Sequence, residues 1–259
     1  MLTAIVKAPA RSLVDASELT FIERVPMDFA LVRAQHAAYC RALARALALV
    51  VTLDASQDLA DSVFVEDTAV ILDELAIITR PGAASRRPET AYIEPALARY
   101  RRIERIQAPG TLDGGDVLRV GRTLFVGAST RTNAEGIEQL ERLAQPLGYI
   151  VVPVAVLDSL HLKTACTALD ASTIVLNPDW IDPEPFKGFA RMTVAAGEPF
   201  GANVLPIGSS LIANEAFPRT LELIARHSDS SGARLIPVNV SEFGKAEAGL
   251  TCLSLLLGE

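Results

Sequence analysis

One pattern returns at an interval of almost fifty residues, and this repeat constrains the fold more than any other feature of the sequence. Each pass begins with a polar cluster, at 61–67, at 113–116 and at His161, and continues with short apolar runs. Glu66 and Asp113 are 47 residues apart, and Asp113 and His161 are 48 residues apart. Self-similarity near this period is typical of repeat and propeller architectures. We therefore interpret the chain as a series of equivalent units.

Each unit is predicted to contain a β-hairpin, a helical stretch and a third strand. Alternating or continuous apolar runs indicate the strands, and apolar residues three and four apart indicate the helices. The expected elements are, in turn, strands 68–72 and 75–79, helix 90–100 and strand 103–106; strands 117–120 and 123–126, a helix capped by Asn133 and strand 149–154; strands 164–169 and 172–176, a weaker helix near 183–189 and strand 191–195; hairpin 202–213, helix 218–227 and strand 235–240.

The fifth unit is incomplete at the carboxyl end, where 250–257 is expected to be one apolar strand. The amino end supplies the missing parts, namely a strand at 4–7, a helix from about 28 to 48 and a strand at 49–53. The two ends can therefore close a ring. We predict an α/β fold, a five-bladed pseudosymmetric ββαβ propeller, as a single domain over 1–259. Equivalent positions of such a ring face one axis, so the polar clusters are expected to meet in a central pocket.

The stretch 110–116, Gly-Thr-Leu-Asp-Gly-Gly-Asp, has the most marked local pattern. Two carboxylates, Asp113 and Asp116, surround a pair of glycines and precede a strand. Glycine permits positive φ and close backbone approach, so this turn is expected to direct both acids. An isolated motif of this kind is most often a simple turn into a strand, and it is the recurrence along the chain that favours a functional site.

Composition excludes several classes of function. The net charge is −7 and there is no basic run, which argues against nucleic-acid binding. No apolar stretch is long enough to span a bilayer, and the amino end is expected to be a strand rather than a signal peptide. The three cysteines, an odd number at wide spacing, indicate free thiols in a reducing, cytoplasmic environment. With three histidines and no Cys-x-x-Cys pair, a structural metal site is not expected.

Six segments in order resemble the dimethylarginine dimethylaminohydrolases of the guanidine-modifying, or pentein, superfamily. The resemblance covers nearly the whole chain and implies a five-bladed ββαβ propeller. It also implies hydrolysis of Nω-methylated arginine to citrulline and methylamine or dimethylamine, without metal or organic cofactor. The matching segments are 61–67 (DSVFVED), 78–83 (ITRPGA) with 85–87 (SRR), 111–117 (TLDGGDV), 131–133 (RTN), 161–164 (HLKT) and 250–252 (LTC).

The resemblance implies that Cys252 is the nucleophile and His161 the general acid and base. A thiolate is a strong nucleophile, and an imidazole with a pKa of about 6.5 suits proton transfer near neutrality. Glu66, Asp67 and Asp113 are expected to surround the guanidinium, because a planar cation with several N–H donors needs carboxylates around its edge. Taken alone, each of these residues would more often be structural.

Further residues are expected to recognise the rest of the substrate. By the same resemblance, Asp61, Arg86 and Arg131 contact the α-amino and α-carboxylate ends, and an arginine can hold a carboxylate bidentately. The remaining expected substrate contacts are Phe64 beside the alkyl chain and Ala246 near the amino end. A lid over 11–27 is expected to reach the substrate through Leu19, with Leu13 as the alternative. Two residues are expected to support the site: Asp116 by fixing the turn or the histidine, and Glu247 electrostatically.

Two other functions are left open. Another enzyme of the superfamily, an arginine deiminase or an amidinotransferase, would use the same residues. A non-catalytic pentein that binds protein or RNA is the alternative from a different class, and the retained Cys252, His161 and acids argue against it, as does the net negative charge. The sequence also leaves open a homodimer and the methylation preference.

Overall fold

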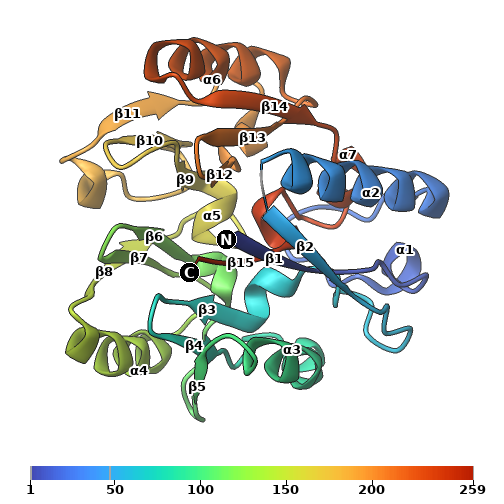
Figure 1. The fold of residues 1–259 in the computed structure, drawn as a ribbon, viewed down its shortest axis with the longest axis vertical. Coiled ribbons are helices and arrows are strands. Elements are labelled where there is room, and N and C mark those ends of the chain that lie inside the picture. Colours follow the sequence, from blue (N-terminus) through green and yellow to red (C-terminus); the bar gives the residue numbers. More distant parts are fainter. Residues whose placement is uncertain (1, 47, 259) are drawn as a thin grey trace.

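Five small sheets surround a central axis in the computed structural model, which describes residues 2–46 and 48–258 (Figure 1). Each sheet has three strands. Two of them form an antiparallel hairpin or its equivalent, and the third pairs in parallel with the middle strand. The predicted α/β propeller of five units is confirmed.

The sheets follow one another along the chain. The sheets are β3–β4–β5 (Ala69–Ile71, Leu75–Ile78, Arg102–Arg105), β6–β7–β8 (Val117–Val120, Thr123–Ala128, Ile150–Ala155), β9–β10–β11 (Cys166–Ala168, Thr173–Leu176, Ala190–Thr193), β12–β13–β14 (Leu205–Ile207, Ser210–Asn214, Arg234–Val238) and β15–β1–β2 (Leu255–Leu257, Leu2–Lys7, Ala48–Leu53). The α-helices are α1 (Leu13–Ala16), α2 (Phe29–Arg45), α3 (Thr90–Leu97), α4 (Ala134–Ala144), α5 (Leu162–Ala165), α6 (Pro218–Ser231) and α7 (Ser241–Gly244).

The second unit shows why the sequence folds in this way. Gly121 takes a φ of 59° in the tight turn between β6 and β7, a conformation that glycine adopts without strain. Asn133 caps α4, because its side chain accepts a hydrogen bond from the amide of Gly136. Leu140 is fully buried on the inner face of that helix. Gly148 then ends the helical region in the left-handed conformation.

The ring is closed by both ends of the chain. Strand β15 pairs antiparallel with β1, with Thr3 opposite Leu257, and β1 pairs in parallel with β2. Helix α2 connects β1 to β2 and begins at Asp28, whose side chain accepts the amides of Ala30 and Leu31. The amino end therefore supplies the parts that the carboxyl end lacks, as predicted. The expected helix 28–48 and domain 1–259 include residues 1, 47 and 259, which lie outside the described part of the chain.

Three expected elements differ from the structure. The run 250–257 is not one strand, because Thr251–Leu253 forms a 3-10 turn before the short β15. The expected strand 164–169 begins only at Cys166, after the helical turn α5. In the third unit, the predicted helix near 183–189 is reduced to a 3-10 turn at Glu184–Phe186. A short buried apolar run has the same composition in a strand as in a helical turn, so periodicity cannot distinguish them.

A short helical turn precedes the first strand of every sheet. These turns lie toward the axis, and the first of them contacts both the second and the last. They therefore bring residues from distant parts of the sequence to the centre of the ring. The turns are Val65–Thr68, Gly114–Asp116, α5, Pro199–Ala202 and Thr251–Leu253.

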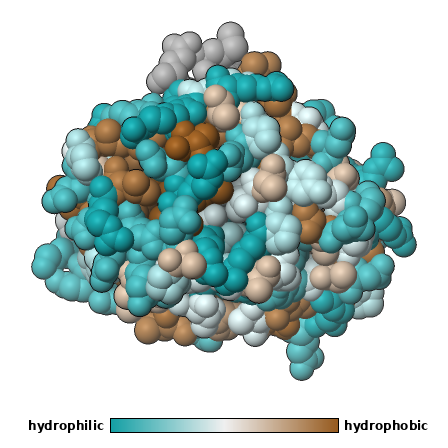
Figure 2. All heavy atoms as spheres, turned by 90° about the horizontal axis from the view of Figure 1, so that it is seen from below, coloured by the Kyte–Doolittle hydropathy of each residue, from teal (hydrophilic) through white to brown (hydrophobic). Residues whose placement is uncertain are grey.

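Helices α2, α3, α4 and α6 lie on the outside of the ring, and the surface seen in Figure 2 is mostly polar with smaller apolar areas between. Apolar side chains of the strands and helices pack between neighbouring units; Tyr39 of α2 and Phe243 of α7, for example, are fully buried in one cluster. None of the helices in the described part of the chain is both long enough and apolar enough to cross a membrane.

We predict that deleting 255–259, which removes β15 but retains Cys252, abolishes cooperative folding. Leu255 and Leu257 are 4% and 2% exposed, and losing each buried leucine costs about 2–5 kcal/mol against a total stability of roughly 5–15 kcal/mol. Thermal melting followed by circular dichroism measures the effect. Deletion of 258–259 alone, beyond the strand, is the control and should melt like the parent. Wild-type melting of the longer deletion would contradict closure of the ring by β15.

Candidate active site

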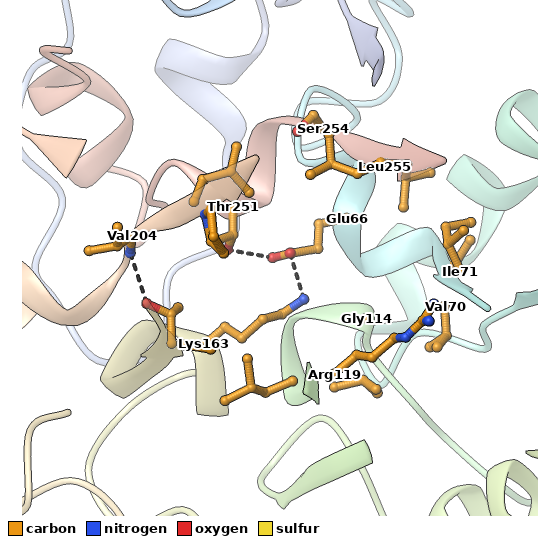
Figure 3. A pocket seen from close by; sticks show the side chains of 18 residues that line it. Glu66, Val70, Ile71, Gly114, Arg119, Lys163, Val204, Thr251, Ser254 and Leu255 are labelled. Carbon is orange, nitrogen blue, oxygen red and sulfur yellow. Dashed lines mark hydrogen bonds and ion pairs between the residues drawn. The ribbon is translucent and has the colours of Figure 1, made fainter. Parts of the chain in front are cut away.

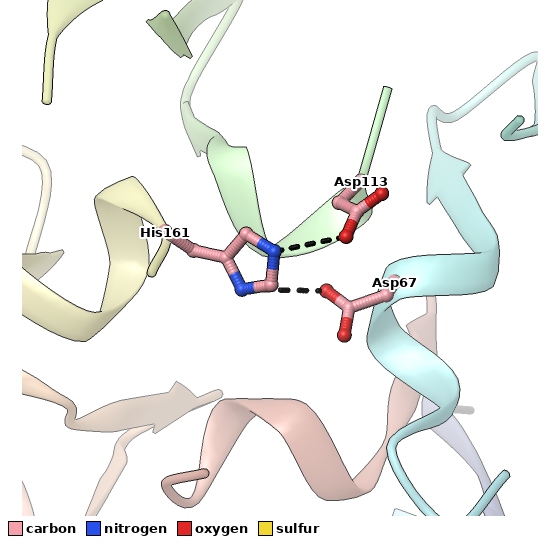
Figure 4. Close-up of side chains that lie close together, drawn as sticks. All are labelled: Asp67, Asp113 and His161. Carbon is pink, nitrogen blue, oxygen red and sulfur yellow. Dashed lines mark hydrogen bonds and ion pairs between the residues drawn. The ribbon is translucent and has the colours of Figure 1, made fainter. Parts of the chain in front are cut away.

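Three buried polar side chains from three different units meet at the axis. The Nε2 atom of His161 lies 3.0 Å from Oδ2 of Asp113, and its Nδ1 atom lies 3.8 Å from Oδ1 of Asp67 (Figure 4). Each of these residues is at most 4% exposed. Asp67 belongs to the turn before β3, Asp113 precedes the turn before β6, and His161 directly precedes α5. The predicted convergence of these three residues is therefore present in the structure.

The charges of this cluster stabilise one another. Burial alone would lower the pKa of His161, but the carboxylates of Asp67 and Asp113 outweigh it and raise this pKa to about 9. Burial would likewise raise the pKa of Asp67, but His161 and Arg86 lower it to about 2. A raised histidine pKa means that the proton is retained at neutral pH, so the ring is an imidazolium between two carboxylates.

Asp116 lies behind the histidine and holds its backbone. This fully buried carboxylate accepts hydrogen bonds of 2.6 Å from the hydroxyls of Ser129 and Thr132 and one of 2.9 Å from the amide of Leu162. Burial raises the pKa of Asp116 to about 6, although His161 and these hydrogen bonds oppose that shift. Because Leu162 follows His161 directly, Asp116 fixes the segment that carries the histidine, as expected from the sequence.

The glycine pair of the central motif is required for close approach. A Cβ atom on Gly114 would lie 1.9 Å from the backbone oxygen of Glu66, and one on Gly115 would lie 2.7 Å from Nδ1 of His161. Neither glycine is among the described residues with positive φ. The positive φ that the sequence suggested for these glycines is therefore not adopted. The suggested close approach of their backbone to neighbouring residues is present.

Cys252 lies in the same pocket as this cluster. It is the middle residue of the 3-10 turn before β15, and its Sγ atom accepts a 3.4 Å hydrogen bond from the amide of Gly249. Burial, followed by the negative charges of Glu66 and Asp67, raises the pKa of the Cys252 thiol to about 12. The thiol is therefore protonated at neutral pH in the unliganded protein.

The pocket is nearly closed in this structure. Its free volume is about 20 Å³, which is room for about one water molecule. Phe64, 4% exposed, packs edge-on against Phe243 at one side of it. The residues that line the pocket come from the turns at the axis, from the positions just before them and from more distant segments; they are Glu18, Asp61, Phe64, Asp67, Arg86, Asp113, Arg131, Leu160, His161, Ala246, Glu247, Ala248 and Cys252.

Glu66 does not line this pocket, although the sequence predicted it beside Asp67. Its carboxylate accepts a 2.6 Å bond from Nζ of Lys163 and a 2.8 Å bond from the hydroxyl of Thr251 (Figure 3). These three residues line a second cavity, of about 280 Å³, to which all five units contribute. The expectation that Glu66 surrounds the same cation as Asp67 and Asp113 is corrected, because successive residues of the turn face different cavities. The sequence analysis gave no role to Lys163, although it lies in the quoted segment 161–164.

Arg86 lines the pocket and also has partners within the chain. Its guanidinium donates to the carboxylate of Asp67 at 2.5 Å, to that of Glu89 at 2.8 Å and to the backbone oxygens of Asp61 and Phe64. The expected contact of Arg86 with the substrate carboxylate stays a prediction. Arg86 holds Asp67 in place. Burial raises the pKa of Glu89 to about 7, even though Arg86 opposes that shift. The sequence analysis did not identify Glu89; its position three residues after Arg86, a spacing that allows an ion pair on one face of a helical turn, was the available signal.

Asp61 and Arg131 face the mouth of the pocket. One oxygen of Asp61 is buried and has no hydrogen-bond partner among the described residues, and the other accepts the amide of Glu18 at 3.0 Å. Arg131 donates to the carboxylate of Glu18 at 3.2 Å and to the hydroxyl of Thr20 at 2.9 Å. Among the residues of the expected lid, Glu18 lines the pocket and Leu19 does not, so the expected contact of Leu19 with the substrate stays a prediction.

Leu13, the alternative lid residue, is fully buried in a hydrophobic cluster and does not line the pocket. Ala246, expected near the substrate's amino end, does line the pocket and is 5% exposed. The neighbouring Glu247 also lines it and has a φ of 57°, which is unusual for a residue other than glycine. The structure therefore places Ala246 and Glu247 at the pocket, but not Leu13.

The carboxylate of Glu247 binds the backbone of the lid segment, which we define as residues 17–22. It accepts hydrogen bonds from the amides of Thr20 at 2.8 Å, of Ile22 at 2.9 Å and of Phe21 between them. The expected electrostatic support therefore takes the form of an anchor: three N–H groups of one loop share a single charged acceptor.

Asp67, Asp113 and His161 are also close enough to share a metal ion, since their ligand atoms lie within 4.8 Å of one another. A histidine binds metal through a neutral ring nitrogen. Here both ring nitrogens face carboxylates and the pKa of about 9 keeps the imidazole protonated. The donor set therefore fits an internal ion-pair cluster better than a metal centre.

Comparison with known proteins identifies the family. The family model described as arginine deiminase matches residues 55–196. The dimethylarginine dimethylaminohydrolase of Streptomyces coelicolor is 41% identical over 99% of this chain and 97% of its own length, and that of Pseudomonas aeruginosa is 38% identical over 97% of each chain.

A solved structure of the Pseudomonas aeruginosa enzyme, a cysteine-to-serine variant with citrulline bound, superimposes with a TM-score of 0.93 at 36% identity over 99% of this chain and 100% of that one. These matches extend over almost the entire sequence, so the segments that carry Cys252, His161 and the acids of the pocket lie within the matched range. The resemblance seen in the sequence is confirmed: this chain belongs to the arginine deiminase family and, within it, to the dimethylarginine dimethylaminohydrolases.

Proposed function

We propose that the protein hydrolyses Nω-methylated L-arginine, either asymmetric dimethylarginine or monomethylarginine, to L-citrulline and dimethylamine or methylamine. The observation that carries this proposal is the placement of the Cys252 thiol in one closed pocket with a protonated His161 held by two carboxylates. The names of the relatives and the citrulline in the related structure support the choice of substrate and product. No cofactor is needed for this chemistry.

The charges of the pocket suit a substrate with a cationic end and an amino-acid end. Asp67 and Asp113 attract the guanidinium, and Phe64 provides an apolar wall for the alkyl chain. The unpartnered oxygen of Asp61 is suited to the α-ammonium, because a buried carboxylate oxygen without a partner is unfavourable until a donor arrives. Arg131 is suited to the α-carboxylate.

The first half-reaction joins the substrate to the enzyme. The bound guanidinium brings a positive charge beside Cys252, which offsets the carboxylates that raise the thiol pKa and favours loss of the proton to solvent. The thiolate then attacks the guanidino carbon and forms a C–S bond. His161, an imidazolium in the free protein, donates its proton to the departing amine as the C–N bond breaks. A covalent thiouronium on Cys252 remains.

The second half-reaction releases the product. His161, now neutral, accepts a proton from a water molecule that attacks the same carbon, and the C–S bond breaks. Citrulline leaves, and the thiol returns to its protonated form. In this scheme Arg86 and Asp116 are positioning residues, since Arg86 holds Asp67 and Asp116 holds the amide that follows His161.

We propose that the five units act as one catalytic domain, because the pocket draws its residues from several of them. We place the enzyme in a reducing cytoplasm, because Cys40, Cys166 and Cys252 are all free thiols in this structure.

We predict that the wild-type protein forms citrulline from asymmetric dimethylarginine and that Cys252→Ser abolishes this turnover without lowering the melting temperature. The serine hydroxyl is a much weaker nucleophile than the thiolate. Citrulline formation is measured by colorimetry, and mass spectrometry of acid-quenched enzyme detects the adduct. Cys40→Ser, at the half-buried cysteine of α2, is the control and should turn over normally.

Two outcomes of this assay would contradict the proposal. Full activity of the Cys252→Ser variant would exclude the covalent step at this residue. Faster turnover of arginine than of methylarginines, with ammonia as co-product, would instead identify a deiminase.

We predict that His161→Gly lowers kcat by at least about two orders of magnitude, the usual scale for the loss of a general acid and base. Binding of the substrate should change much less. Steady-state kinetics with asymmetric dimethylarginine separate kcat from KM. His227→Gln, at the partly exposed histidine of α6, is the control. A near-normal kcat for His161→Gly would show that another group transfers the proton.

We predict that Cys252 of the free enzyme reacts slowly with iodoacetamide at pH 7 and that its rate rises about tenfold with each pH unit, without levelling off below about pH 11. A thiol pKa raised to about 12 leaves very little thiolate at neutral pH. The measurement is the rate of alkylation of Cys252 by mass spectrometry as a function of pH, with Cys40 as the internal comparison. Fast alkylation at pH 7 that no longer changes with pH would show that the thiolate is already formed without substrate.

A further inference from the structure

The proposed reaction does not use Glu18, yet this residue occupies the mouth of the pocket. One oxygen of its carboxylate accepts a 3.2 Å bond from the guanidinium of Arg131, and the other accepts the hydroxyl of Ser85. Its backbone amide donates to the carboxylate of Asp61 at 3.0 Å. Glu18 therefore presents an N–H donor to Asp61 and a carboxylate to Arg131 at the same time.

These are the two groups that a free amino acid would present. The proposed function assigns Asp61 to the α-ammonium and Arg131 to the α-carboxylate of the substrate. Glu18 thus satisfies, from within the chain, the pair of residues proposed to bind the amino-acid end.

The surroundings of Glu18 allow it to leave. Its side chain is 40% exposed, whereas that of Arg131 is 9% exposed, so the glutamate approaches a largely buried arginine from the solvent side. The backbone that follows is held by Glu247 through the amides of residues 20–22. The carboxylate of Glu18 can therefore turn away from Arg131 and Ser85 while the anchor of the lid segment remains bonded.

We propose that Glu18 is a specificity-determining residue that competes, as an internal ligand, with the α-carboxylate of the substrate. This inference rests on the proposed function and deepens it. The apparent affinity of a ligand is its intrinsic affinity multiplied by the fraction of the protein whose site is free. An internal ligand that occupies the site therefore lowers the apparent affinity. A ligand with an α-carboxylate must displace Glu18 from Arg131. Agmatine, which lacks that carboxylate, leaves the Glu18–Arg131 pair intact.

The test compares two ligands in a background that cannot turn them over. In Cys252→Ser protein, isothermal titration calorimetry gives the Kd of asymmetric dimethylarginine and of agmatine, with Glu18 intact and as Glu18→Gln. A half-exposed ion pair is a weak interaction, so we expect Glu18→Gln to tighten dimethylarginine by about three- to tenfold. Agmatine should bind to the Glu18→Gln variant as tightly as to the protein with Glu18, or more weakly, because the variant lacks a negative charge near the amine of agmatine. Glu23→Gln, the same change at an exposed residue of the adjacent loop, is the matched control.

The sign of the effect separates the alternatives. If Glu18 only closed the lid over bound substrate, Glu18→Gln would weaken both ligands, and that result would overturn the inference. Equal tightening of both ligands would also overturn it, because it would show no competition for Arg131. The proposed function is tested separately by citrulline formation in protein with Cys252. Citrulline formed by that protein, together with unchanged dimethylarginine binding in Glu18→Gln, would reject the inference and leave the function standing.

Discussion

The burial of several carboxylates at the axis is the constraint on which the rest of the structure depends. An unpaired charge in the interior costs several kcal/mol, so each buried acid needs a partner. The structure supplies His161 for Asp113 and Asp67, Arg86 for Asp67, and Lys163 for Glu66. The exception is one oxygen of Asp61, which lacks a partner among the described residues and lies where a cationic ligand would enter.

The same arrangement accounts for the states of the two reactive groups. Asp67 contributes to both states. Its charge helps to keep His161 protonated, and together with burial and Glu66 it keeps the Cys252 thiol protonated. In the proposed mechanism, a bound guanidinium lowers the pKa of the thiol, because it adds positive charge beside the sulfur while the carboxylates still hold the histidine. Activation of the thiol would then depend on the presence of a cationic substrate.

Access to this centre is governed by a different part of the chain. The lid segment 17–22 is bound at one end by Glu247 and presents Glu18 to Arg131 at the other. The catalytic groups belong to the turns of the ring, whereas the lid comes from a loop between α1 and α2. In the proposed mechanism, selection of the amino-acid end of a substrate and chemistry at its guanidinium therefore depend on separate elements that meet in one pocket.

The repeat period and the incomplete last unit were enough to predict five units and closure by both termini, because strand and helix patterns depend on local residue order. The expected roles of Cys252 and His161 came from the resemblance of six segments to a known family. The sequence could not tell that Glu66 faces away from Asp67, that Arg86 binds internal carboxylates, or that Glu18 rather than Leu19 enters the pocket. Those outcomes depend on how side chains of short turns and loops point once the units pack around the axis, and on partners supplied by distant segments, which no local pattern encodes.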